Sequence, residues 1–125
     1  MIVRNRDEVM AVDWGNGTSY RYLLEADKMG FTVCHTVVRA GTKSAMEYRR
    51  HLEACYCFAG RGTLATADGS ASYDLRPGVL YALDAHDAHF LIADPDTDLE
   101  LISVFSPALQ GGERHNLSAD GFSQY

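Results

Sequence analysis

Short apolar runs of strand length, rich in β-branched residues, recur along this chain between turn-forming residues. They span residues 31–39, 50–58, 63–66, 71–75, 79–83, 88–93 and 99–105. Glycine or proline occupies most of the breaks between them and supplies turn conformations that a strand does not adopt. Only residues 20–27 show a helical pattern. The pattern therefore predicts a domain that is mostly β.

Many short strands with this spacing are typical of a sandwich or a small barrel, which closes its own edges and encloses a ligand cavity. The 125 residues, 46% of them hydrophobic, are enough for one compact domain and too few for two ordinary ones. We therefore expect residues 1–125 to form a single domain. Residues 13–24 and 106–125 are rich in Gly, Ser, Asn and Asp. We expect both segments to be mobile without ligand and to close over the barrel mouth.

The charge balance limits the partners of this chain. With 11 basic and 17 acidic side chains, the net charge is -6, which argues against nonspecific binding to nucleic acid or to an anionic membrane. The N-terminal residues are charged and lack an apolar run, so we expect neither a secretory signal nor a membrane anchor, and a cytoplasmic location. Three cysteines in apolar runs, Cys34, Cys55 and Cys57, indicate buried thiols rather than a disulfide framework.

One predicted strand carries a carboxylate on the same face as two of these thiols. Residues two apart in a strand share a face, so Glu53, Cys55 and Cys57 point one way. A buried carboxylate is costly unless it is paired or bound to a metal ion, so Glu53 requires a partner if this face is the core. The alternative, about equally favoured by the spacing, is that the strand frays at Glu53 and leaves the carboxylate in solvent.

Tyr81 and His89 bracket a tight turn, and we expect both to face inward from the two arms of a hairpin. Each of them alone is more often a core or rim residue than a ligand. Together with Glu53 they form a set of three ligands with open coordination positions, which suits a Lewis-acid site for a divalent metal. The phenol needs such a metal to ionise, because its ordinary pKa of roughly 10 keeps it protonated at neutral pH.

These segments resemble the cupin superfamily, whose second motif is built around a Pro-Gly turn such as Pro77-Gly78. The His-x-His of its first motif is replaced here by His51-Leu52-Glu53, and this points more narrowly to the ectoine synthase family. The resemblance runs along nearly the whole chain. Its matching pieces are residues 1–5, 29–31, 51–54, 56–57, 77–78, 81–84, 86–87, 89, 104–105, 112–113 and 115.

The resemblance implies an all-β fold, a small cupin-type β-barrel or jelly roll. It also implies a carbon-oxygen lyase that closes N-γ-acetyl-2,4-diaminobutyrate to ectoine, a compatible solute made under osmotic stress, with loss of water. The implied cofactor is Fe(II), with another divalent metal as the alternative, and the implied assembly is a homodimer. The metal ligands carry over to Glu53, Tyr81 and His89; the catalytic residues to Glu113, His115, Tyr48 and His51; and the substrate contacts to Arg21, Thr36, Ser103 and Phe105.

Several of these positions also have simpler interpretations. Without the resemblance, Glu113 and His115 are more typical of a polar surface turn near the C-terminus. Arg21 suits a substrate carboxylate because its planar fork binds it bidentately, although an arginine in a charged N-terminal segment is usually just solvated. Thr36 shares its row with Cys34 and is also explained as plain barrel lining.

The chain departs from the family pattern at two pocket positions. The family's Trp-x-Ser-x-Arg pattern appears here with Gly17 in place of the tryptophan, so the sequence predicts that one wall of the pocket is missing. Ser103 replaces a cysteine. These departures predict weak turnover of the family substrate, improved by Gly17→Trp combined with Ser103→Cys. Three functions stay open: an ectoine synthase, a divergent paralogue acting on another amino-acid derivative, and a non-catalytic metal-binding cupin sensor.

Overall fold

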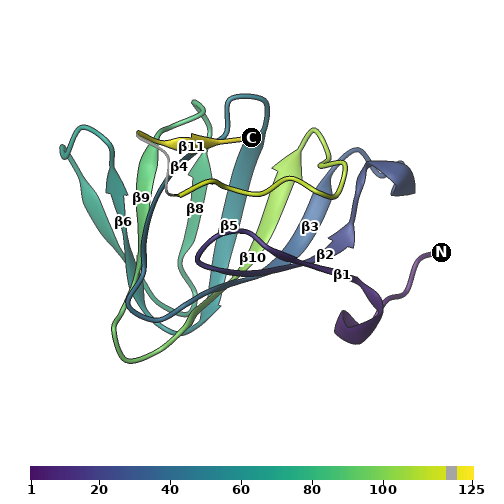
Figure 1. Cartoon of the computed structure of the whole chain (residues 1–125), viewed down its shortest axis with the longest axis horizontal. Helices are drawn as coiled ribbons and strands as arrows, with labels where there is room; N and C mark the ends of the chain where they lie inside the picture. The colour runs from purple at the N-terminus through teal and green to yellow at the C-terminus, as the bar shows by residue number, and fades with distance from the viewer. Residues whose placement is uncertain (118–120) are drawn as a thin grey trace.

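The computed structural model describes residues 1–117 and 121–125. Nearly all of their regular structure is β (Figure 1). The strands are β1 (Met10–Asp13), β2 (Gly17–Leu23), β3 (Thr32–Val38), β4 (Lys43–Glu47), β5 (Leu52–Ala59), β6 (Gly62–Thr66), β7 (Ser72–Leu75), β8 (Leu80–Leu83), β9 (His89–Ala93), β10 (Leu99–Ser106) and β11 (Ser123–Gln124).

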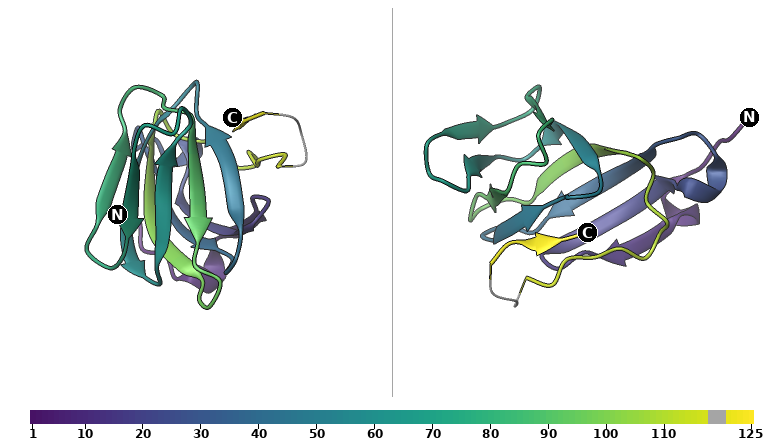
Figure 2. Two further views of the ribbon diagram at one scale, coloured as in Figure 1. Left: turned by 90° about the vertical axis from the view of Figure 1, so that its left-hand side faces the viewer. Right: turned by 90° about the horizontal axis from the view of Figure 1, so that it is seen from above.

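The strands form two sheets that face each other (Figure 2). One sheet has six strands in the order β1-β2-β3-β10-β5-β8, and the other has five in the order β11-β4-β9-β6-β7. Neighbouring strands pair antiparallel except β11, which lies parallel to β4. Chain segments cross repeatedly between the sheets, as expected for the predicted jelly-roll barrel.

The seven predicted strands are all present, and each end lies within two residues of its predicted position. The helical pattern over residues 20–27 gives no α-helix, and only residues 25–27 form a 3₁₀ turn. Residues 17–23 form β2, which pairs with β1 on one edge and β3 on the other, and this pairing outweighs a weak local helical pattern. Strands β1, β4 and β11 were not predicted.

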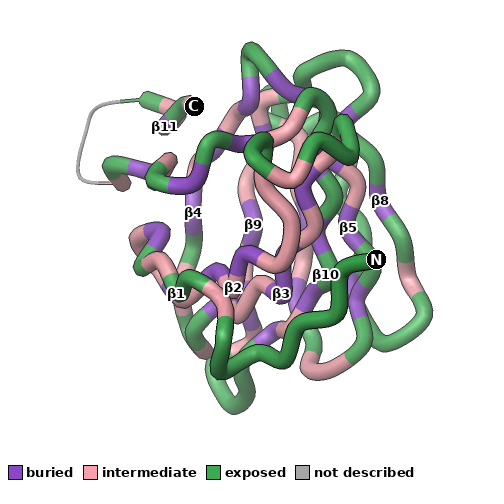
Figure 3. Tube along the Cα trace, turned by 90° about the vertical axis from the view of Figure 1, so that its right-hand side faces the viewer, coloured by how far each residue is buried: buried purple, intermediate pink, exposed green. Residues whose placement is uncertain are grey.

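Burial alternates along the central strands and places the core between the two sheets (Figure 3). On β5, Glu53, Cys55 and Cys57 are buried, whereas Leu52 and Tyr56 are exposed. The alternation confirms the predicted shared face and shows that Glu53 does not lie in solvent. Cys34, Cys55 and Cys57 are buried free thiols, as predicted.

The N-terminal segment runs exposed along the surface and is held there by contacts that include an ion pair of Arg4. Arg4 donates both guanidinium nitrogens to the Asp27 carboxylate, at 2.7 and 2.9 Å. Asp27 ends the second of two short 3₁₀ turns, η1 (Arg6–Glu8) and η2 (Glu25–Asp27). Within the described residues, no helix is long and apolar enough to cross a membrane.

The two segments predicted to be mobile both contact the body of the fold. Most of residues 13–24 belongs to β2, inside the six-stranded sheet. After β10 the chain returns over the barrel, where Leu109 is fully buried, and its last strand, β11, pairs with β4. Residues 118–120 of the C-terminal segment lie outside the described residues. Mobility and closure stay predictions.

Candidate functional site

A narrow cavity lies between the sheets beneath the C-terminal segment. Its volume is about 20 Å³, which is space for about one water molecule. The cavity is lined by Trp14, Ser19, Thr36, Met46, Tyr48, Glu53, Cys55, Tyr81, Leu91, Leu101, Ser103, Phe105 and Tyr125. Six of the eleven residues that the resemblance singles out therefore line this space, and His89 lies beside one of them, Tyr48.

Glu53 brings a carboxylate into this cavity from β5. Its side chain is buried, and burial raises its pKa to about 8. No cationic side chain among the described residues forms an ion pair with it. A carboxylate in this position therefore favours either a proton or a bound cation.

Tyr81 lies next to Glu53 on the neighbouring strand β8, directly opposite Cys55 in the register. Its phenol is buried, and burial together with the nearby Cys55 and Glu53 raises its pKa well above the ordinary value. Without a cation beside it, Tyr81 keeps its proton at neutral pH.

His89 faces the same region from β9 of the opposite sheet. Its Nδ1–H donates to the carbonyl oxygen of Asp87 at 2.9 Å, so Nε2 carries the lone pair, and this buried atom has no hydrogen-bond partner. The predicted hairpin between Tyr81 and His89 is wrong. β8 pairs with β5 and β9 with β4 and β6, because the turn between them crosses from one sheet to the other.

The three residues fit a divalent metal by their chemistry. Histidine ligands generally donate one ring N–H to a carbonyl or carboxylate and present the other ring nitrogen to the metal. His89 makes such a bond from Nδ1, which leaves Nε2 for a metal. Glu53 offers a buried carboxylate without a cation, and Tyr81 an adjacent phenol. Within the described parts of the chain, no three His, Cys, Asp or Glu residues gather as a metal cluster, so a site here requires the tyrosine oxygen.

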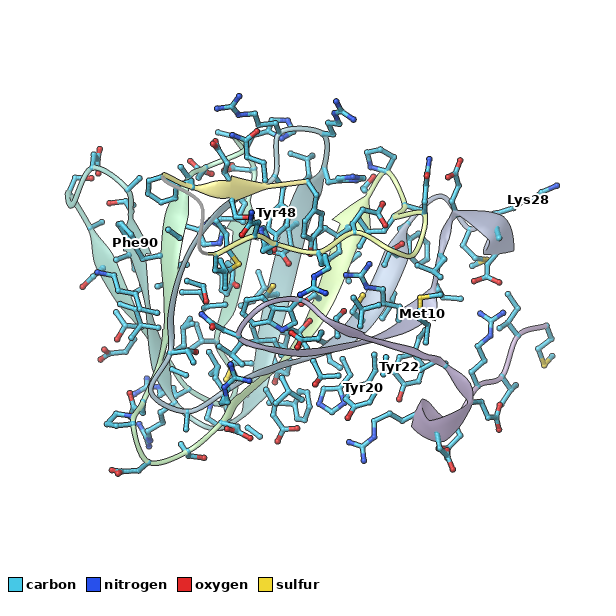
Figure 4. The ribbon with its side chains drawn as sticks, in the orientation of Figure 1. Met10, Tyr20, Tyr22, Lys28, Tyr48 and Phe90 are labelled. Carbon is cyan, nitrogen blue, oxygen red and sulfur yellow. The ribbon has the colours of Figure 1, made fainter. Side chains whose placement is uncertain are left out.

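Aromatic and imidazole rings form the roof of the cavity. Tyr48 lies beneath the C-terminal strand β11 (Figure 4), with its hydroxyl 3.0 Å from His115 Nε2. The ring of Tyr125 packs against that of His115 in a tilted arrangement, with ring centroids 4.4 Å apart, and meets Tyr48 edge-on at 5.0 Å. Burial lowers the pKa of His115 to about 3 and raises that of Tyr48 well above its usual range. Both groups are therefore neutral at pH 7.

His51 supports this roof from the side. Its Nδ1–H donates to the carbonyl oxygen of Pro107 at 2.8 Å, and its ring meets Phe105 edge-on. His86, in the left-handed region with φ 55, bonds through Nδ1 to the carbonyl oxygens of Tyr48 and His51. These bonds join the segment before β5 to the turn between β8 and β9.

Arg21 and Glu113 hold the C-terminal segment in place. Arg21 is buried and donates to the carbonyl oxygen of Gly111 at 2.8 Å and to that of Glu113. The Glu113 carboxylate accepts from the backbone N–H groups of Gln110 and Gly111, both at 2.8 Å. Burial opposes ionisation of Glu113, but these bonds and Arg21 outweigh it and lower its pKa. Proton transfer by Glu113 and carboxylate binding by Arg21 stay predictions.

A row of hydroxyl and thiol groups crosses the cavity floor on the six-stranded sheet. Thr36 Oγ1 lies 2.9 Å from Ser103 Oγ, which lies 3.3 Å from Cys55 Sγ. Ser19 is opposite Thr36 at one end of the row, and Tyr81 is opposite Cys55 at the other. Thr36 therefore belongs to the cavity wall, as both of its predicted interpretations require.

The predicted loss of an indole wall is wrong, because Trp14 supplies one. Trp14 follows β1 in a tight turn, yet it is 3% exposed and lines the cavity beside Ser19. Gly17 has no room for a side chain, since a Cβ there would lie 1.8 Å from the carbonyl oxygen of Val37. The Asp-Trp-Gly-Asn sequence reads as an exposed turn, and the inward indole depends on contacts that only the fold creates.

The two-sheet barrel with polar side chains converging in its interior defines a cupin-type protein. A solved cupin 2 conserved barrel domain protein from Salinispora arenicola CNS-205 shares this fold, with a TM-score of 0.67 at 19% identity over 85% of this chain and 88% of that one.

More specific matches give the family. The model of the ectoine synthase family matches residues 1–122. L-ectoine synthase from Wolinella succinogenes is 40% identical over 93% of this chain and 92% of its own length. The crystal structure of ectoine synthase from P. lautus superposes with a TM-score of 0.82 at 36% identity, covering 89% of this chain and 81% of that one. The chain belongs to the ectoine synthase family.

Proposed function

We propose that this protein is an ectoine synthase, a hydro-lyase that closes N-γ-acetyl-2,4-diaminobutyrate to ectoine. The observation that carries the proposal is the buried pair of Glu53 and Tyr81 in the cavity wall, with buried His89 beside Tyr48 on the opposite sheet, in a chain that belongs to this family. In the reaction, the α-amino nitrogen attacks the amide carbonyl carbon of the same molecule. The carbonyl oxygen leaves as water with the two hydrogens of the amine, and a C=N bond remains in the ring.

Glu53, Tyr81 and His89 would hold the metal ion, Fe(II) or another divalent metal, and a bound ion supplies a Lewis acid that polarises the amide carbonyl. The protein contributes by excluding water and by fixing the substrate's conformation. An amine and an amide held in one substrate conformation react as neighbours, which removes much of the entropic cost of ring closure.

Tyr48 and His115 are suited to move protons in this reaction. The imidazole of His115 is neutral at pH 7, so its Nε2, 3.0 Å from the Tyr48 hydroxyl, is placed to accept the hydrogen bond of that hydroxyl. Tyr48 keeps its own proton because burial raises its pKa, so it is a donor to a departing oxygen. Thr36 and Ser103 provide hydroxyls for the polar groups of the substrate, and Phe105 an apolar wall.

The experiment incubates iron-loaded protein, kept free of oxygen, with the synthetic substrate. Chromatography then measures the ectoine that is formed. Glu53→Ala, Tyr81→Ala and His89→Ala should each lower metal content and turnover together, while circular dichroism shows the fold retained. Full metal occupancy in all three variants would contradict the ligand assignment. Metal binding without any ectoine formation would favour the divergent paralogue or the metal-binding sensor, and neither binding nor turnover would favour another function.

The outer face of the six-stranded sheet supports a homodimer. Ile102, Tyr56 and Leu80 lie side by side across β10, β5 and β8 and are 37%, 46% and 62% exposed. Their apolar neighbours on this face are Leu52, Phe58 and Val104. A net charge of -6 keeps two copies apart except where a face is uncharged, so a second copy of this chain is the partner we propose.

Sedimentation of the wild type and of Tyr56→Glu tests the dimer. We expect the wild type to sediment as a dimer and the variant as a monomer with an unchanged circular dichroism spectrum. A wild-type monomer at micromolar concentration would contradict the proposal.

We also propose that the protein works in the cytoplasm, where its product serves as a compatible solute under osmotic stress.

A further inference from the structure

Trp14 is the sole tryptophan of the chain and one of the walls of the cavity. It lies just after β1, in the turn that leads into β2, where its backbone N–H bonds to the carbonyl oxygen of Gly17 at 3.2 Å. An indole in such a turn ordinarily projects into solvent, yet this one is 3% exposed. Its position therefore requires a specific set of contacts.

Two parts of the chain hold the indole in place. Its Nε1–H donates to the carbonyl oxygen of Val37 on β3 at 3.1 Å. Its backbone carbonyl accepts from the N–H of His115 at 3.1 Å, and its ring meets the His115 imidazole edge-on at 6.3 Å. Because these contacts come from β3 and from the C-terminal segment, the indole is rigidly placed between the sheet and the roof.

Gly17 is part of the same arrangement. A Cβ at this position would lie 1.8 Å from the Val37 carbonyl oxygen and 3.1 Å from the Trp14 Nε1. Any side chain at position 17 would therefore displace the acceptor of the indole N–H or the indole itself. The absence of a side chain at Gly17 and the presence of the indole of Trp14 are thus coupled.

Trp14 closes one end of the polar row on the cavity floor. The row begins at Tyr81 beside Glu53 and ends at Ser19, which shares the cavity wall with Trp14. Between β5 and β2 lie three strand spacings, or about 14 Å. Because the indole lines the same cavity as Glu53, it shortens the space along this row that remains for a ligand anchored at Glu53.

We propose that Trp14 is a specificity-determining residue that limits the length of the substrate measured from Glu53, Tyr81 and His89. This inference rests on the proposed function. It implies that the protein accepts an N-acetyl diamino acid and rejects longer homologues, and that a smaller side chain at position 14 relaxes this limit.

The test compares N-γ-acetyl, N-γ-propionyl and N-γ-butyryl 2,4-diaminobutyrate, together with the N-γ-acetyl compound extended by one glycine at its carboxylate. For the wild type we expect kcat/KM to fall at least tenfold between the acetyl compound and the longer ones. In Trp14→Leu, the ratio of kcat/KM for the acetyl compound to kcat/KM for a longer compound should shrink at least tenfold. We expect this for the compounds extended at the acyl end, for the one extended at the carboxylate end, or for both. Trp14→Phe, which keeps an aromatic ring, should lie between.

Leu64→Ala is the matched control, because Leu64 is buried on β6 outside the cavity lining. It should lower stability without changing the ratio. An equal loss for all substrates in Trp14→Leu and Trp14→Phe would overturn the proposal, as would an unchanged ratio.

Binding gives a readout that does not depend on turnover, because all tryptophan fluorescence of the wild type comes from Trp14. Binding affinity, measured by the quenching of this fluorescence, should fall at least tenfold from the acetyl to the butyryl compound. Such a fall supports the length limit even if no compound is converted. A complete lack of conversion would overturn the proposed function alone. Equal quenching by all compounds would overturn the length limit even if ectoine is formed.

Discussion

Ser103 on β10 and Cys55 on β5 face each other directly across the six-stranded sheet, with Oγ and Sγ 3.3 Å apart. The cavity thus holds a thiol one strand away from Ser103, the position at which the sequence resemblance leads us to expect a cysteine. Thr36 completes the contact on the other side of Ser103, at 2.9 Å. The change from thiol to hydroxyl at Ser103 is therefore accommodated within the row rather than left without a partner.

This contact predicts that Cys55 and Ser103 are energetically coupled. Ser103→Cys should lengthen the bond to Thr36 and lower kcat/KM, whereas Cys55→Ser combined with Ser103→Cys should recover part of the loss. We expect a coupling free energy of about 0.5 to 1.5 kcal/mol. A double-mutant cycle in kcat/KM measures it. Cys57→Ser, on the same face of β5 but outside the cavity lining, should leave kcat/KM unchanged, and additive effects would contradict the coupling.

Gly17→Trp should damage the protein rather than improve it. A side chain there overlaps the Val37 carbonyl oxygen, so even Gly17→Ala should cost more than about 2 kcal/mol of the free energy of unfolding. Urea unfolding measures this cost. Gly112→Ala is the control, because a Cβ at Gly112 meets no atom within 4 Å. Equal stabilities of the two alanine variants would show that β2 shifts to accept a side chain.

Glu53 should make the metal-free protein less stable at higher pH. Its pKa is about 8 in the folded chain and close to 4.5 in the unfolded chain, so the folded state binds the extra proton between these values. The contribution of Glu53 to the free energy of unfolding is therefore full below pH 4.5. It falls as the pH rises to 8, by up to about 4 kcal/mol. Thermal unfolding of metal-free wild type and Glu53→Gln from pH 5 to 8 should show a steeper decline for the wild type. Parallel curves would contradict it.

Arg21 should stabilise the C-terminal segment. Replacing it by methionine leaves the carbonyl groups of Gly111 and Glu113 without their donor, at a cost of about 2 to 4 kcal/mol. Hydrogen exchange in residues 109–117 should accelerate and KM for the substrate should rise. Arg4→Met removes an exposed ion pair and should cost less than about 1 kcal/mol, with no effect on residues 109–117. Unchanged exchange in Arg21→Met would refute the role.

The sequence predicted the strands well where short apolar runs end at glycine or proline. It failed at β2, where alternation of Tyr20 and Tyr22 with buried Ser19 and Arg21 is visible only once the partners on both edges are known. Tyr20 and Tyr22 lie together away from Tyr48 (Figure 4). The local pattern therefore predicts the strands that are bounded by clear turn signals, and it does not predict β1 and β2 at the edge of the six-stranded sheet.

The candidate site shows the same division. Glu53 was recognisable because a carboxylate on a row of thiols is unusual in a core, and its burial confirms that face. Trp14 was not recognisable, because its inward position depends on an acceptor on β3 and a neighbour about one hundred residues later in the chain. Contacts between distant segments are fixed by tertiary structure, so no local pattern reports them.

The crossing of the chain between β8 and β9 places Tyr81 and His89 in different sheets. An ion shared by Glu53, Tyr81 and His89 would therefore act as a cross-link through the interior of the barrel, tying the two layers together at one point. Its affinity would depend on how far apart the layers stand. Substitutions that wedge the sheets apart, even far from the ligands, would then weaken metal binding, and chelation would loosen the whole barrel.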